Sequence, residues 1–210
     1  MDSGRLEAFS DGVFAVAITL LALDLAVRGP DLAAQLAHHW PAFAAFVVSF
    51  FTIGIIWVNH HALFRNFSRI DRPLLFLNLL LLFFVVLIPF ATSTIAAYLR
   101  EGSASAAVAA AIYQGVLEGM SISFALLLWR GIRREHLRVA FTAGQARRAA
   151  LRFSIGNLGY IAGIGIAFVS APASLAISGL VAVYYIFEQT PGRDQDAPAT
   201  DPPAEDQAKS

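Results

Sequence analysis

Six long apolar segments are the feature that most constrains how this chain can fold. They cover about residues 6–27, 42–64, 74–99, 106–129, 152–170 and 172–188. A helix needs roughly 20 apolar residues to cross a bilayer, and the sixth segment, of roughly 17, is near the lower limit. Because a backbone inside lipid must satisfy its own hydrogen bonds, each segment should be an α-helix. The sequence therefore predicts an all-α, polytopic membrane protein with six transmembrane helices.

Composition agrees with this class and divides the chain in two. Hydrophobic residues make up 57% of the 210 residues and charged residues only 14%, which is outside the range of soluble domains. We expect residues 1–188 to form the transmembrane subunit. Residues 189–210 are acidic and proline-rich, and we expect them to be disordered. The absence of cysteine excludes disulfides and thiolate metal sites.

Basic residues predict the orientation. With six spans, thirteen lysines and arginines fall on the side that holds both termini, and only Arg28 and Arg100 fall on the other. The side rich in lysine and arginine is normally cytoplasmic, so we expect a bacterial inner-membrane protein with both termini inside. A five-span reading would put the C-terminal tail outside. Part of the basic charge lies between Arg130 and Arg152, which is either an ordinary positive-inside loop or an amphipathic helix on anionic lipid.

The first apolar segment has two different faces when it is placed on a helix. Gly12, Val16, Thr19, Leu20 and Leu23 fall on one stripe, whose only polar side chain is Thr19. Such a stripe suits a pore wall, in which apolar rings form a constriction and a ring of hydroxyls meets the ion. Periodicity alone leaves a second reading open, in which the stripe faces lipid or another helix. The chain has no Thr-Val-Gly-Tyr-Gly motif for a filter of backbone carbonyls, so the selectivity of any such pore would come from side chains.

Polar residues collect at one end of the first two segments. Arg5, Ser10 and Asp11 begin the first segment, and Trp57, Asn59, His60 and His61 end the second. Because the two segments run in opposite directions, these groups can meet at one membrane depth. A buried carboxylate needs donors, which an arginine, an indole or an imidazole can supply, so we expect a structural network around Asp11. A proton or ion sensor is the functional alternative. Adjacent histidines diverge on a helix, so no metal site is predicted.

The motif Arg5-x-x-x-Phe9-Ser10-Asp11, together with Trp57-Val-Asn59-His60-His61, resembles the lysosomal potassium-channel family of the transmembrane protein 175 type. The likeness is to its short prokaryotic six-helix form and covers about residues 5–188. It implies a cation channel assembled as a tetramer, with the first helix lining the pore. Positions matching Val16, Thr19 and Leu23 line the pore in that family, with Leu20 on the same stripe. The matching motif residues, including Phe9, form a polar network that braces the pore helix.

We therefore expect a potassium-permeable channel that conducts passively and is not an enzyme. Its partners would be potassium ions, the bilayer and identical subunits, with no nucleic acid and no cofactor. The alternatives are a secondary cation transporter, which normally shows internal repeats, and an intramembrane enzyme, which needs a nucleophile–base pair or a metal. The sequence displays neither feature. Glu118, in the fourth segment, is expected to form a hydrogen bond between helices, with a proton relay as the alternative.

Overall fold

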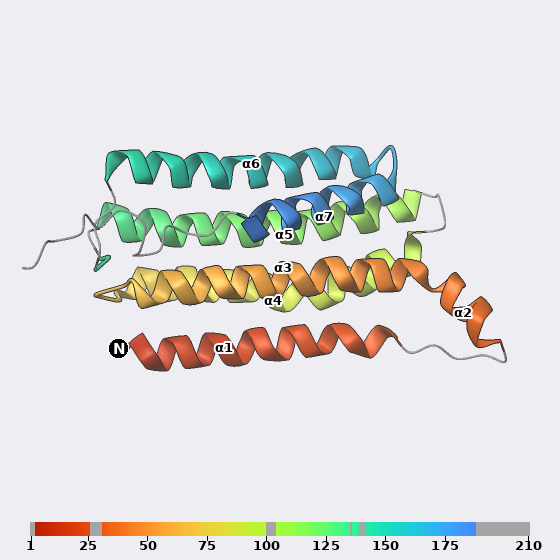
Figure 1. Cartoon of the computed structure of the whole chain (residues 1–210), viewed down its shortest axis with the longest axis horizontal. Helices are drawn as coiled ribbons and strands as arrows, with labels where there is room; N and C mark the ends of the chain where they lie inside the picture. The colour runs from red at the N-terminus through yellow and green to blue at the C-terminus, as the bar shows by residue number, and fades with distance from the viewer. Residues whose placement is uncertain (1–2, 26–30, 100–103, 135, 139–141, 188–210) are drawn as a thin grey trace, which may run out of the picture.

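The structure is a computed structural model that describes residues 3–25, 31–99, 104–134, 136–138 and 142–187. The described residues form an all-helical bundle (Figure 1). Its elements are α1 (Ser3–Leu20), the short 3-10 helix η1 (Leu21–Leu25), α2 (Leu32–His38), α3 (Trp40–Arg65), α4 (Arg72–Tyr98), α5 (Ala104–Arg133), α6 (Ala143–Ala167) and α7 (Ala171–Phe187).

Among the described residues, five helices are long and apolar enough to cross a membrane, namely α1, α3, α4, α5 and α6. The sixth predicted span corresponds to α7, whose 17 residues span about 25 Å at 1.5 Å per residue. That length is less than the hydrocarbon thickness of roughly 30 Å. Figure 1 accordingly shows α7 ending part-way along the bundle. The expected tail, residues 189–210, lies outside the described residues.

Local chemistry fixes where the long helices begin. Asp71 caps α4 by accepting a hydrogen bond from the Leu74 backbone N–H at 3.0 Å, which satisfies one of the free donors of the first turn. Thr142 and Gln145 form a reciprocal capping box at the start of α6. This start lies nine residues before the predicted span, at residue 143 instead of 152. The stretch between Arg130 and Arg152 is thus largely the ends of two transmembrane helices, and its loop is shorter than expected.

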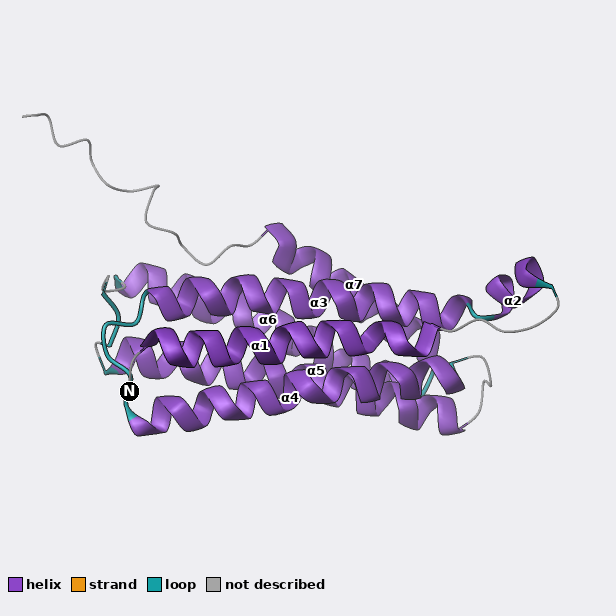
Figure 2. Cartoon of the chain, turned by 90° about the horizontal axis from the view of Figure 1, so that it is seen from below, coloured by secondary structure: helices purple, strands orange, loops and turns teal. Residues whose placement is uncertain are grey.

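The long helices lie side by side with their axes roughly parallel. Helix α1 lies at one edge of the bundle in Figure 1 and nearest the viewer in Figure 2. Helix α1 packs on α3 and α4, while α6 and α7 lie on the far side against α5. Glycines permit two of these close approaches. A side chain at Gly119 would collide with the Phe84 ring, and one at Gly156 would collide with Tyr185. Gly156 and Gly119 are therefore packing sites between helices, whereas Gly115 has open space around it.

A polar clamp joins the two inter-helix loops at the end of the bundle that holds the N-terminus. The Arg130 guanidinium donates to both carboxylate oxygens of Asp71. This hydrogen bond holds the pKa of Asp71 below its ordinary value. Backbone bonds from Ser68 N–H to His136 O and from Arg138 N–H to Asn66 O, each 2.7 Å, tie the same loops together. The clamp fixes the register of α4 against α5.

Candidate functional site: the exposed stripe of α1 and its polar brace

Helix α1, together with the 3-10 helix η1 that continues it and holds Leu21 and Leu23, has one buried and one open face, as the sequence periodicity predicts. The stripe of α1 below includes this extension. Leu6, Phe14, Ala17 and Leu21 are at most 4% exposed and pack on α3 and α4. The opposite stripe remains open in the single chain: Val16 is 58% exposed, Leu20 40% and Leu23 71%. Gly12 and Thr19 are exposed on the same face. A contiguous apolar stripe on a helix at the edge of the bundle is a surface that binds lipid or another protein.

Thr19 is the polar member of that stripe. Its Oγ1 donates to the carbonyl oxygen of Val16 at 2.8 Å. The hydroxyl hydrogen is therefore used within the helix, while the oxygen lone pairs point away from that bond. Thr19 consequently presents an acceptor on an otherwise apolar surface.

The buried edge of α1 is joined to α3 and α4 by a directed chain of hydrogen bonds. Ser10 Oγ donates to the Leu6 carbonyl at 2.9 Å, and Asn78 Nδ2 donates to Ser10 Oγ at 3.0 Å. Asn78 Oδ1 is then the acceptor for His60 Nε2, 2.8 Å away, so His60 carries its proton on Nε2. Ser10, His60 and Asn78 are all 0% exposed. A series of hydrogen bonds in which each donor is paired with an acceptor is the low-energy arrangement for polar groups in an apolar interior.

Two further contacts link α1 to α3 nearer the surface. Trp57 Nε1 donates to Asp11 Oδ1 at 2.9 Å. His61 Nδ1 lies 2.8 Å from Glu7 Oε1, although the ring orientation does not give a good hydrogen bond. Together with the buried series of hydrogen bonds at Ser10, these contacts attach α1 to its neighbours at three positions: Glu7, Ser10 and Asp11. We call this set of contacts the polar brace. It fixes the rotation of α1 and so decides which face is left open.

Known proteins provide an independent comparison. Residues 5–89 match the family described as Endosomal/lysosomal potassium channel TMEM175. A potassium channel of Streptomyces collinus is 50% identical over 205 residues, which cover 94% of this chain and 98% of that protein. The chain belongs to the TMEM175 family. The crystal structure of a lysosomal potassium-selective channel TMEM175 homolog from Chamaesiphon minutus superposes with a TM-score of 0.77 at 33% identity, covering 88% of this chain and 96% of that one. The human endosomal/lysosomal proton channel TMEM175 is 38% identical over 109 residues, 46% of this chain and 22% of that protein.

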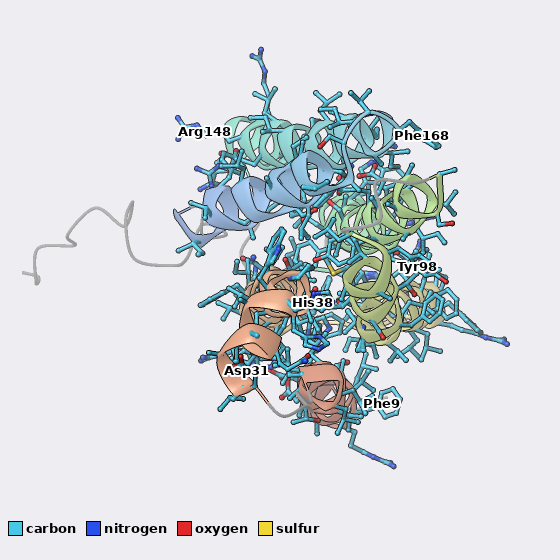
Figure 3. The ribbon with its side chains drawn as sticks, turned by 90° about the vertical axis from the view of Figure 1, so that its right-hand side faces the viewer. Phe9, Asp31, His38, Tyr98, Arg148 and Phe168 are labelled. Carbon is cyan, nitrogen blue, oxygen red and sulfur yellow. The ribbon has the colours of Figure 1, made fainter. Side chains whose placement is uncertain are left out.

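This TMEM175 member is thus an all-helical, multi-pass membrane protein. Not every residue predicted for the network belongs to the brace within one chain. Arg5 and Phe9 lie on the exposed side of α1, and Figure 3 shows Phe9 pointing away from the other helices. The reason is geometric: Phe9 and Arg5 are one turn apart, so both project from the side of α1 opposite α3. Asn59 is partly buried on α3.

Two brace residues were not assigned to the network from the sequence. Asn78 stands out as an amide inside the third apolar segment, and Glu7 as an acid one turn before Asp11. Their partners depend on how α4 and α3 pack on α1, which periodicity does not determine. His60 also stacks on Phe64, with ring centroids 4.1 Å apart, so the two adjacent histidines have separate structural partners. In the described residues no three histidine or acidic side chains are grouped as a metal site would require.

Proposed function

We propose that this chain is the subunit of a potassium-permeable, passive cation channel in which the exposed stripe of α1 lines the pore. The observation that carries this proposal is the combination of an open apolar stripe with a brace that fixes its direction. Polar contacts at three positions hold one side of α1, and the other side is exposed in the single chain. Such a helix is oriented to present its exposed side to a partner or to a pore. The named function of the Streptomyces and Chamaesiphon relatives, potassium conduction, supports the proposal.

A single chain offers no enclosure for an ion, because α1 lies at the edge of the bundle and is covered by other helices on one side only. A ring of identical subunits solves this, since each copy contributes one α1 to a central axis. We propose a homotetramer. Its pore would be lined by Val16, Leu20 and Leu23 as apolar rings and by Thr19 as a ring of oxygens. Exposed Phe9 and Arg5 are then free to complete contacts between subunits.

Each ring has a distinct physical role in this proposal. Narrow apolar rings resist hydration, so they set the conductance and can close the pore by dewetting. The Thr19 oxygens replace part of the hydration shell of a dehydrated ion at a depth where other side-chain oxygens are scarce. The polar brace keeps the rings in register. None of these steps makes or breaks a covalent bond, so the protein would act as a channel and not as an enzyme.

We further propose that the end of the bundle holding the N-terminus is cytoplasmic. The arginines at the α3–α4 and α5–α6 loops gather there, beside the clamp formed by Asp71 and Arg130 (Figure 1). An excess of arginine and lysine marks the cytoplasmic face of a bacterial inner membrane. Even-numbered crossings would then bring the chain after α7 back to the same side.

Ion flux in liposomes tests the proposal. Purified protein should dissipate a potassium gradient rapidly and without a coupled ion, and Thr19→Val should lower the preference for potassium over sodium because it keeps the side-chain shape and removes the oxygen. Reversal potentials under bi-ionic conditions measure that preference. Saturable, coupled flux would identify a transporter instead. A current carried by protons alone would match the name of the human relative and refute potassium permeation.

A further inference from the structure

The α5–α6–α7 half of the bundle contains an acidic residue that the proposed pore does not use. Glu118 lies near the middle of α5, and it is the only aspartate or glutamate in the sequences of α3 to α7. The expected hydrogen bond between helices is not made by its Oε2, which is buried and has no partner among the described residues. An ionised carboxylate in that position is costly, because the bilayer interior solvates charge poorly.

Contacts on either side show what surrounds Glu118. Ser121 Oγ donates to Asn157 Oδ1 at 2.5 Å on α6, and Gln114 lies against Gly163 of the same helix. The antiparallel register between these contacts places Tyr160 opposite Glu118. Glu118 therefore points into the interface with α6.

A second line of contacts gives its neighbour on α7. Gln114 Nε2 donates to the Ser174 carbonyl at 2.6 Å and to Ser174 Oγ at 3.0 Å. Helices α5 and α7 run in the same direction (Figure 1), so one turn further on Ser178 lies at the level of Glu118. Ser178 and Gln114 are both 0% exposed. Each has a buried oxygen, Oγ and Oε1 respectively, with no partner in the described part of the chain.

Three buried oxygens without partners thus lie within one helical turn: Gln114 Oε1, Glu118 Oε2 and Ser178 Oγ. The amide nitrogen of Gln114 is already occupied, so its Oε1 needs a donor. No arginine or lysine lies at this level of the described helices, and α4 presents apolar side chains there. The titratable groups on the facing helices are phenols, Tyr160 of α6 and Tyr185 of α7, whereas the hydroxyl of Tyr113 on α5 is bonded to Ser49 of α3.

We propose that Glu118 is a proton-binding site, held as a neutral carboxylic acid whose O–H is shared with the oxygens of Gln114 and Ser178. A bound proton gives the carboxyl an O–H donor, which Gln114 Oε1 needs because an amide oxygen can only accept, and the Ser178 hydroxyl can either donate or accept. The proton also removes the charge that the bilayer interior disfavours. The site lies on α5, separate from α1, so it does not depend on the proposed pore.

Carbodiimide labelling tests this directly. Hydrophobic dicyclohexylcarbodiimide reacts with protonated carboxyls in apolar surroundings, and peptide mass spectrometry locates the adduct. In the full-length protein in liposomes we expect an adduct at Glu118 that increases as the pH falls from about 9 to about 6. Absence of the adduct throughout that range, or labelling only by a water-soluble carbodiimide, would overturn the proposal. Suppression by sodium or potassium at constant pH would assign the oxygens to an alkali cation and would also overturn it.

Glu118→Gln provides a second readout, because the amide has the shape of the neutral acid and cannot ionise. We expect the melting temperature of the wild-type protein to fall more than that of the variant when the pH is raised from about 6 to about 9. The reason is that raising the pH favours loss of the Glu118 proton in the wild-type protein. Equal trends in the two proteins would show that Glu118 binds no proton in this range. A variant less stable than wild type at every pH would show that the ionised carboxylate is the form the fold needs.

Discussion

Replacing Asn78 by leucine tests whether the polar brace holds α1. The leucine has the same number of side-chain heavy atoms and the same branching at Cγ, but it cannot accept from His60 Nε2 or donate to Ser10 Oγ. Ser10 keeps its own bond to the Leu6 carbonyl, so it loses only an accepted bond. His60 is 0% exposed, and its Nδ1 already has no partner among the described residues, so its ring would be left without a side-chain hydrogen bond. A buried group left unpaired costs about 1–3 kcal/mol.

Taking a cost of about 2 kcal/mol, a chain of this length should unfold about 4–8 °C lower. The melting temperature of purified protein in detergent measures the shift, and size-exclusion chromatography reports the oligomer. Thr94→Ala is the matched control, because Thr94 is a partly exposed residue of the same helix whose hydroxyl donates to the Phe90 carbonyl of that helix. Asn78→Leu with wild-type stability and flux would refute the idea that this chain of hydrogen bonds fixes α1.

Three further changes have defined outcomes. Asp11→Ala combined with Trp57→Phe in a double-mutant cycle should give a coupling of about 0.6–1.7 kcal/mol, and zero coupling would mean that their 2.9 Å contact is incidental. Leu23→Ala should raise potassium flux in liposomes by widening an apolar ring, whereas unchanged flux would place the narrow point elsewhere. Asp71→Asn keeps the helix cap but removes the charge paired with Arg130, so it should lower the melting temperature at neutral pH. Because the folded pKa of Asp71 is depressed, the charge contributes above the unfolded pKa and is lost as the pH falls through the folded value, so the gap between the two proteins should close only in strong acid.

The helices and the two faces of α1 could be predicted from the sequence because both depend on interactions between residues close together in the chain. Apolar length identifies spans, and the 3.6-residue period separates the buried Phe14 from the exposed Val16 without knowledge of any partner. The start of α6 was misplaced because Arg147, Arg148 and Arg152 interrupt the hydropathy of a helix whose beginning depends on the Thr142 cap. The extra helix α2 is seven residues long and was missed because it has too few turns for a periodic signal.

The polar brace could be predicted only in part, since it depends on contacts between helices. The sequence indicated that Asp11 needs a donor and that Trp57 stands at the matching depth, and the two are bonded. It did not select Asn78 over the other intramembrane amides, because the choice depends on which face of α4 meets α1. Arg5 was one of three kinds of donor expected for Asp11, beside the indole and the imidazoles; it lies on the exposed side of α1, and within one chain the donor is the Trp57 indole.

Thiol accessibility on α1 tests the central claim most directly. The chain has no cysteine, so Leu23→Cys introduces the only thiol, and Val86→Cys on the exposed side of α4 is the matched control, 51% exposed in the single chain. A charged, water-soluble thiol reagent should block potassium flux through the Leu23→Cys protein, because the modified ring obstructs a water-filled pore. It should leave flux through the Val86→Cys protein unchanged. A Leu23→Cys protein that conducts normally after treatment, with its thiol unmodified, would contradict a pore lined by α1.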